Sequence, residues 1–182
     1  MKDLSEKTIG TQRIYEGNIF TVRKDEAQMP DGLIAEREVV EHRGGVGIAL
    51  EDEDGKFFMV TQYRYAQKCV TLEFPAGKKE VGEDPLTTAK REIAEETGYE
   101  GTDWFYLGKM FPTPAYDSEV IDLYYAKKGA FMGQHLDEDE NLNVSRYSLR
   151  EIEDMITDGK IPDAKTMGMA LLIRTNKERG RI

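Results

Sequence analysis

The chain has 182 residues, of which 39% are hydrophobic, and it carries 35 acidic and 25 basic side chains for a formal net charge of −10. A chain of this length and composition can bury a full hydrophobic core and most simply forms one main domain. The acidic balance, with a pI near 4.8, argues against a general binder of nucleic acid or of anionic membranes, because such partners need a basic surface.

The first 42 residues are predicted to form an antiparallel β-ribbon. Apolar side chains alternate with polar ones around Phe20 and again at 39–40, and residues 30–32, Pro-Asp-Gly, supply the chemistry of a hairpin turn. We therefore expect an N-terminal element over residues 1–42, followed by the main domain over residues 43–182.

The main domain is predicted to begin with three central strands, at 45–50, 57–64 and 70–74. An Asp-Glu-Asp-Gly turn at 52–55 joins the first two of them. Further strands are predicted near 104–107, 120–125 and, after an acidic stretch at 137–140, near 143–144.

A helix is predicted from residue 85 to residue 97. Asp84 can accept hydrogen bonds from its first N–H groups, Pro85 suits its first position, and Gly98 suits the left-handed residue just past its end.

Two further helices are predicted near the C-terminus. Ser148 and Glu151 form a capping box that opens a helix ending near Gly159, and Asp163 caps the last helix. Strands around one central helix, with a second helical layer at the C-terminus, predict an α+β fold of the α/β/α sandwich type.

The central helix carries three glutamates whose spacing predicts a divalent-metal site. At about 100° per residue, Glu92, Glu95 and Glu96 gather beside the apolar flank of the helix, in an acidic face presented to solvent. Two such carboxylates about 4 Å apart repel by about 4 kcal/mol at an effective dielectric near 20, so they either splay into water or hold a cation. Oxygen ligands favour Mg²⁺ or Mn²⁺ over zinc. The softer donors that zinc prefers lack metal-site spacing: His42, His135 and Cys69.

The segment from Gly77 to Tyr99 carries the pattern Gly, five residues, Glu, seven residues, Arg-Glu-apolar-x-Glu-Glu-x-Gly. In this pattern the chain resembles the Nudix hydrolases at every position except the last, where Tyr99 replaces the usual aliphatic residue. The resemblance implies the mixed-sheet sandwich of that family and a water-dependent cleavage of a nucleoside diphosphate linked to another group.

The resemblance also implies roles for individual residues. By this resemblance Glu92 and Glu96 are metal ligands, and Glu95 lines the same site as a ligand and catalytic residue. The backbone carbonyl of Ala76 is the remaining metal ligand. Arg91 becomes the arginine that orients these glutamates through charge-assisted bonds.

Segments outside this motif resemble the ADP-ribose pyrophosphatase and nucleoside-diphosphate-sugar hydrolase branch. They are Leu-Glu-Phe-Pro-Ala-Gly at 72–77, Gln-Tyr-Arg at 62–64 and Arg-Glu-Val-Val at 37–40. Arg37 and Arg64 are the candidates for phosphate or ribose contacts, because a guanidinium matches a phosphate; ordinary strand-face salt bridges are the alternative.

The same branch implies a loop that includes Pro114 and Glu119. Glu119 would be a general base or an extra metal ligand, and the alternative is a surface charge at the start of a strand. This loop departs from the common Ser-Pro-Gly form, since it has Thr-Pro-Ala at 113–115.

The predicted function is therefore the Mg²⁺-dependent hydrolysis of nucleotide sugars, ADP-ribose first and GDP-mannose or a related sugar second. Mn²⁺ is the substitute, and two or more ions take part. The N-terminal ribbon resembles the dimerisation element of this branch, so a homodimer is expected. Two alternatives are open: a Nudix enzyme of other specificity, acting on damaged dNTPs, dinucleoside polyphosphates or RNA caps, and a non-catalytic ADP-ribose sensor.

A cytoplasmic location is expected. The single cysteine, Cys69, excludes an internal disulfide and fits a small buried strand residue in a reducing compartment. Neither a signal-peptide core nor an apolar run of about 18 residues occurs in the sequence.

Overall fold

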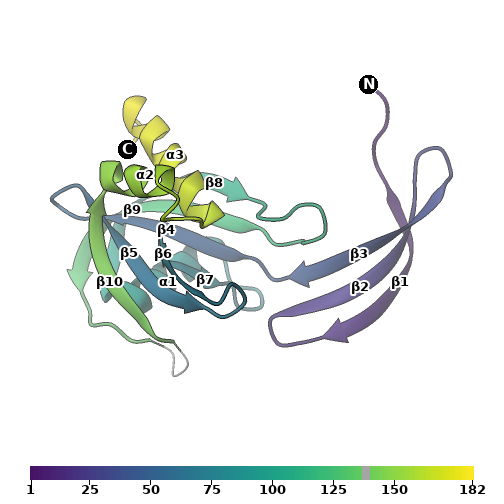
Figure 1. Ribbon diagram of the computed structural model, residues 1–182, viewed down its shortest axis with the longest axis horizontal. Helices are drawn as coiled ribbons and strands as arrows, with labels where there is room; N and C mark the ends of the chain where they lie inside the picture. Colours follow the sequence, from purple (N-terminus) through teal and green to yellow (C-terminus); the bar gives the residue numbers. More distant parts are fainter. Residues whose placement is uncertain (137–139) are drawn as a thin grey trace. The chain divides into compact units, whose positions relative to one another are not determined.

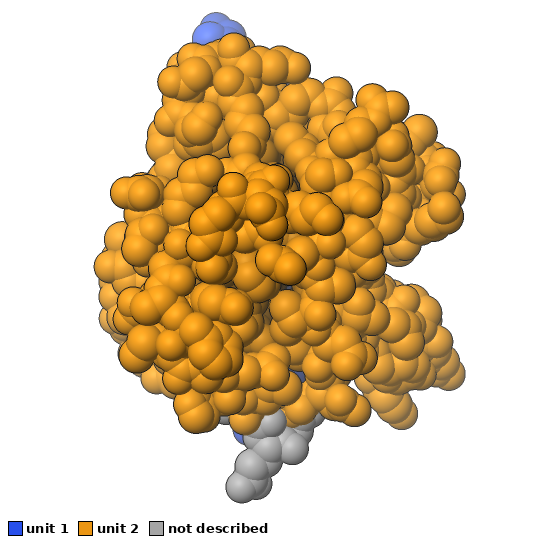
Figure 2. All heavy atoms as spheres, turned by 90° about the vertical axis from the view of Figure 1, so that its left-hand side faces the viewer, with its two compact units in different colours: residues 1–44, 111–120 blue, residues 45–110, 121–182 orange. Residues whose placement is uncertain are grey.

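The computed structural model describes residues 1–136 and 140–182, and the chain divides into two compact units, coloured separately in Figure 2. Unit 1 comprises Met1–Gly44 and Phe111–Val120, and unit 2 comprises Gly45–Met110 and Ile121–Ile182. The predicted break at residue 42 thus lies close to the first of these boundaries, but the predicted domains did not include the return of 111–120 to unit 1.

Unit 1 is built on a three-stranded antiparallel sheet in the order β1-β2-β3 (Figure 1). The strands are β1 (Lys7–Glu16), β2 (Phe20–Gln28) and β3 (Ile34–His42). Gly32 has a φ of 88° in the turn between β2 and β3, a left-handed conformation that glycine adopts without strain. The ribbon was predicted with two strands, and β1 was not recognised as a strand of its own; almost all of its residues are exposed, so its sequence does not alternate between buried apolar and exposed polar side chains.

Unit 2 contains a seven-stranded mixed sheet with the main order β10-β5-β4-β9-β8. β4 pairs in parallel with β9, and the other pairings are antiparallel. The two short strands β6 and β7 pair with β5 and β4 respectively. The strands are β4 (Gly45–Glu51), β5 (Lys56–Arg64), β6 (Cys69–Glu73), β7 (Ala76–Lys78), β8 (Tyr99–Met110), β9 (Ile121–Phe131) and β10 (Leu142–Ser148).

Helices cover both faces of this sheet, as Figure 1 shows. α1 (Pro85–Thr97) packs through Ala89 and Ile93 in the hydrophobic cluster of one face, whereas α2 (Leu149–Thr157) and α3 (Ala164–Glu178) pack in the cluster of the other. The wholly buried strand β4 contributes Ile48 to the first cluster and Ala49 to the second, because successive side chains of a strand point to opposite faces. The predicted α/β/α sandwich is confirmed.

The three helices begin where the sequence predicted. Asp84 accepts hydrogen bonds from the backbone of Leu86 and Thr87, Ser148 forms a complete capping box, and Asp163 caps α3. Cys69, in contrast, was expected to be buried and is exposed; it is the first residue of β6, which among the described strands pairs with β5 alone. Most of the predicted acidic stretch, residues 137–139, lies outside the described part of the chain. Within the described part, no helix is long and apolar enough to span a membrane.

Candidate active site

Two of the three glutamates of α1 lie in the protein interior. Glu96 is 2% exposed and Glu92 is 8% exposed, whereas the side chain of Glu95 is 35% exposed. The expectation of a solvated acidic face is therefore wrong for Glu92 and Glu96. The reason is that β7, which comes from the loop before α1, packs over this side of the helix.

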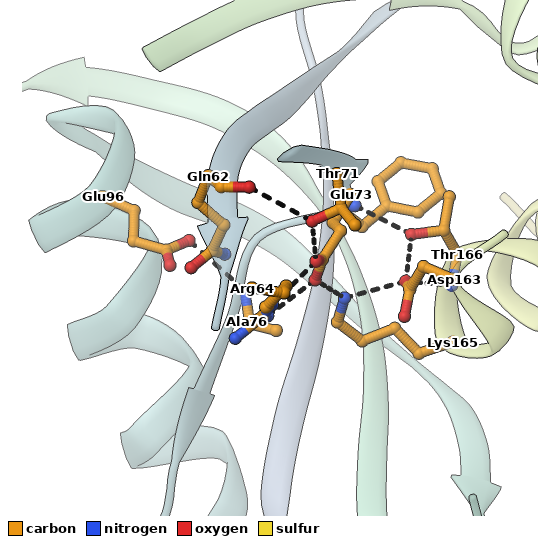
Figure 3. A network of polar contacts seen from close by, with 10 residues as sticks. Gln62, Arg64, Thr71, Glu73, Ala76, Glu96, Asp163, Lys165 and Thr166 are labelled. Atoms are coloured by element: carbon orange, nitrogen blue, oxygen red, sulfur yellow. Dashed lines mark hydrogen bonds and ion pairs between the residues drawn. The ribbon is translucent and has the colours of Figure 1, made fainter. Parts of the chain in front are cut away.

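The close approach of β7 depends on Gly77. A Cβ built on Gly77 would lie 1.8 Å from Cδ of Glu92 and within 2.2 Å of both its carboxylate oxygens. Only glycine leaves room for the Glu92 carboxylate against the backbone at this position. The backbone N–H of the preceding residue, Ala76, donates to Oε2 of Glu96 at 3.3 Å (Figure 3).

Arg91 ties the acidic side chains to one another. Its Nη1 atom lies 2.9 Å from Oε1 of Glu92 and 2.9 Å from Oε2 of Glu95. Its Nε and Nη2 atoms donate to the two oxygens of Glu83 at 3.2 and 3.1 Å, and Nη2 also donates to the carbonyl of Lys78. This arginine therefore links α1 to the loop in front of it.

The two buried glutamates resist ionisation. Burial is the main cause that raises the pKa of Glu92 to about 7 and that of Glu96 to about 8. Neighbouring negative charges raise both further, Glu95 and Glu140 for Glu92, and Glu92 and Glu140 for Glu96. A cation at this place would relieve the same repulsion.

The metal-free protein is expected to lose stability as the pH rises from about 6 to about 8. Because the folded-state pKa values of Glu92 and Glu96 exceed the unperturbed value of about 4.3, the folded state binds more protons than the unfolded state in this range, and its stability falls as they leave. A loss on the order of 2 kcal/mol would lower Tm by about 4 to 8 °C. Thermal unfolding in EDTA across this range measures the effect.

Two controls separate this effect from general alkaline destabilisation. Glu96→Gln should flatten the slope, and Mg²⁺ added at the upper pH should restore Tm, because a ligand of the folded state stabilises it. Glu73, whose pKa is held at about 2, does not titrate in this range. A Tm that is independent of pH in EDTA would contradict the assignment.

The donors at this place fit a hard divalent cation better than any other cofactor, since they are carboxylate and carbonyl oxygens. Among residues 1–136 and 140–182, however, no three His, Cys, Asp or Glu side chains form a group that could hold a metal ion. Arg91 forms ion pairs with Glu95 and with one oxygen of Glu92. The three carboxylates therefore do not converge on one point.

Arg64 lies in a second polar cluster of unit 2, shown in Figure 3. Its Nε and Nη2 atoms donate to the two oxygens of Glu73 at 2.8 and 2.7 Å. Lys165 Nζ lies 2.5 Å from Oε2 of Glu73, and Thr71 Oγ1 donates to Oε1 at 2.6 Å. The strand-face salt bridge considered for Arg64 is thus present, and 41% of its side chain is still exposed to solvent.

Arg37 and Glu119, the other two candidates, belong to unit 1. Arg37 forms a two-pronged contact with Glu6, with donor–acceptor distances of 2.9 and 2.7 Å. Glu119 follows a segment that pairs with β3 through Val40, whose N–H donates to Tyr116 and whose carbonyl accepts from Ser118.

Glu119 Oε1 lies 3.2 Å from Nδ1 of His42. The same nitrogen accepts a hydrogen bond from the backbone N–H of Gly44 at 3.1 Å. Glu119 thus lies beside the end of β3, within unit 1.

Sequence reasoning missed three residues of unit 2. Glu73 and Lys165 are separated by 92 positions in the chain, and neither belongs to a spaced motif that would pair them. Glu140 ends the acidic stretch recognised in the sequence. Its connection to the site is indicated only by its charge, which raises the pKa of Glu92 and of Glu96.

Two family matches cover most of the chain. Residues 41–167 match the family described as NUDIX domain, and residues 6–40 match the nucleoside diphosphate sugar hydrolase N-terminal domain. The division between the two matches falls within β3, two residues before its end.

Several characterised proteins are similar over nearly the whole chain. A methanol dehydrogenase activator of Bacillus methanolicus is 38% identical, with 91% of each chain covered. An ADP-ribose pyrophosphatase of Bacillus subtilis is 33% identical, again with 91% of each covered. A crystal structure of an ADP compounds hydrolase superposes with a TM-score of 0.83 at 22% identity over the full length of both chains, which supports the fold.

Proposed function

Because the chain belongs to the NUDIX domain family, we propose that it is a hydrolase of this family that cleaves the pyrophosphate bond of nucleoside diphosphate sugars, and ADP-ribose in particular. The observation that carries the proposal is the buried pair Glu92 and Glu96 on α1, packed against the glycine of the preceding loop. Two buried glutamates with raised pKa values cost stability, so they are better explained by a ligand that needs them than by the fold.

The substrate class is supported by the regions outside the motif. The match of residues 6–40 is to an N-terminal domain described for nucleoside diphosphate sugar hydrolases, and two relatives at 33% identity are ADP-ribose pyrophosphatases. A GDP-mannose pyrophosphatase is 26% identical, so GDP-mannose is the less favoured substrate. Addition of water across the bridge of ADP-ribose yields AMP and ribose 5-phosphate, with one phosphorus–oxygen bond broken and one formed.

The proposed metal ligands are Glu92, Glu95, Glu96 and the carbonyl oxygen of Ala76. Bound divalent ions, with Mg²⁺ as the first choice and Mn²⁺ as the substitute, would neutralise the pyrophosphate and lower the pKa of water. Arg91 keeps Glu92 and Glu95 near each other while no cation is present.

Two carboxylates are candidates for the base that takes the proton from the attacking water. Glu119 was selected from the sequence, and it lies in unit 1 with the segment that pairs with β3. Glu140 lies in unit 2, and its charge raises the pKa of both buried glutamates. We propose Glu119 as the base, with Glu140 as the second candidate, since whichever residue acts must reach the water at the metal site.

Unit 1 is proposed as the contact between two copies of the chain. Its strands carry three exposed isoleucines, Ile9, Ile14 and Ile34, each close to half exposed or more, and a contact between two copies would remove such apolar side chains from water. Arg37, on β3, is proposed to contribute to substrate binding from this unit.

The test is a panel of substrates incubated with the protein and Mg²⁺, followed by chromatography of the products. We expect AMP and ribose 5-phosphate from ADP-ribose, slower cleavage of GDP-mannose, and no product in EDTA. Faster cleavage of dNTPs or dinucleoside polyphosphates would move the protein to another specificity. Binding of ADP-ribose without turnover of any compound would favour the sensor.

The identity of 38% to a methanol dehydrogenase activator favours a second candidate function, the cleavage of the pyrophosphate bond of a nicotinamide dinucleotide. Nicotinamide dinucleotides, which are common cofactors of hydride-transfer enzymes, contain the same pyrophosphate linkage between two 5′-ribosyl groups. The panel therefore includes NAD⁺, and its cleavage to two mononucleotides at a rate above that of ADP-ribose would support the second candidate.

A further inference from the structure

Lys165 is a buried cation in a place that disfavours one. Its side chain is 7% exposed, and it is the second residue of α3, where the helix dipole repels positive charge. It lies 2.9 Å from Oδ2 of the capping residue Asp163 and 2.5 Å from Oε2 of Glu73. The two carboxylates offset the cost of burying the ammonium group.

Glu73 connects this lysine to Arg64. The carboxylate is 3% exposed, and although burial alone would raise its pKa, Arg64, Lys165 and Thr71 together hold the pKa at about 2. Glu73 is therefore charged at neutral pH, and it receives both Nε and Nη2 of Arg64. Figure 3 shows Lys165 reaching Glu73 from α3 while Arg64 reaches it from β5.

The position of Arg64 matters because its side chain lies near Glu96, one of the proposed metal ligands. Its hydrogen bonds with Glu73, and then the charges of Glu73, Asp163 and Glu96, raise the pKa of its guanidinium, so Arg64 lies within electrostatic reach of a proposed metal ligand. The same turn of α3 also holds the loop before β7, since Thr166 Oγ1 accepts a hydrogen bond from the N–H of Phe74 at 3.0 Å.

Stability is a weak explanation for this arrangement. The attraction within a buried ion pair is often no larger than the free energy needed to remove its charges from water, and replacing such a pair with apolar residues often leaves stability unchanged. What they supply is a fixed geometry, and a bidentate guanidinium–carboxylate pair fixes the plane of the arginine.

We propose that Lys165 is a positioning residue for substrate binding: it fixes Glu73 from α3, and Glu73 in turn fixes the guanidinium of Arg64 for contact with the diphosphate. This inference rests on the proposed function. It assigns to Lys165 no contact with substrate or metal.

The test compares Lys165→Met with the wild-type protein in binding and in turnover. We expect the Kd of α,β-methylene ADP-ribose, a non-cleavable probe, to rise by about tenfold, as is common when a residue that orients a ligand is removed. KM for ADP-ribose should rise in parallel, while kcat changes by less than about threefold, because the interaction serves ground state and transition state alike. The affinity for Mn²⁺ alone should stay within about threefold of wild type.

Lys127→Met is the matched control. Lys127 also pairs with a buried glutamate of unit 2, Glu51, so this variant repeats the chemical change elsewhere and should leave Kd and KM unchanged. Should Lys165→Met fail to fold, the double variant Lys165→Met with Glu73→Gln removes both buried charges and takes its place, with the same loss of probe binding expected.

Each outcome is decisive. A Kd and KM within about twofold of wild type in the variant used would overturn the role of Lys165, as would an equal loss in Lys127→Met. Wild-type protein that neither binds the probe nor cleaves ADP-ribose would overturn the proposed function instead, and the role of Lys165 with it.

Discussion

Replacing Glu96 by glutamine is expected to lower turnover of ADP-ribose by about 10²- to 10⁴-fold, because metal-assisted catalysis supplies several kcal/mol and each 1.36 kcal/mol is a factor of ten. The substitution preserves shape, and the new side-chain carbonyl can still accept the hydrogen bond that Ala76 donates to Oε2. It removes the charge that burial disfavours, since the pKa of Glu96 is raised to about 8. We therefore expect the variant to be folded and, above about pH 7, more stable than wild type without metal.

Steady-state kinetics at saturating Mg²⁺ and thermal unfolding in EDTA measure these two effects. Glu51→Gln is the matched control, because Glu51 is also 2% exposed in unit 2 but is held by Lys127, Lys177 and Tyr125. This control should lose stability, since it leaves two lysines without their carboxylate, and retain turnover per folded molecule. Near-normal turnover in Glu96→Gln would show that this carboxylate is not a metal ligand.

The elements of the fold that follow from local sequence were predicted well. The ends of α1 depend on Asp84 and Gly98, which act through hydrogen bonds and backbone conformation within one turn of the helix. The spacing of the three glutamates likewise fixes them on one side of the same helix. Such features are determined by neighbours in the chain, and they can be read without the tertiary structure.

Burial of the glutamates could not be predicted in this way. It depends on β7, which pairs with β4, a contact between distant parts of the chain that no helical periodicity encodes. The partnership of Glu73 with Lys165 is of the same kind. For Arg64, the sequence offered a salt bridge or a phosphate contact, and the structure contains the salt bridge while leaving part of the side chain exposed, so the two are compatible.

Replacing Gly77 by alanine is expected to separate the metal site from the stability of the fold. The new Cβ would collide with the carboxylate of Glu92, at 1.8 Å from its Cδ. Because the carboxylate is the mobile end of a flexible side chain, Glu92 can turn away at small cost in folding free energy. It would then leave the place that the metal requires. We expect the affinity for Mn²⁺ to fall by about 10- to 100-fold, the loss typical when a residue that supports a ligand is removed, and turnover at limiting metal to fall with it.

Gly82→Ala, in the segment between β7 and α1, is the matched control, and we expect it to affect stability and not metal affinity. Gly82 has a φ of 78° and no neighbouring atom within 4 Å of a built Cβ, so alanine there strains the backbone by about 1 kcal/mol and displaces no glutamate. Titration of Mn²⁺ by calorimetry and denaturant unfolding of both variants should therefore give a crossed pattern. Gly77→Ala should lose metal affinity with little loss of stability, and Gly82→Ala should lose stability with little loss of affinity. Wild-type Mn²⁺ affinity in Gly77→Ala would mean that Glu92 does not hold the ion from the position it occupies beside this glycine.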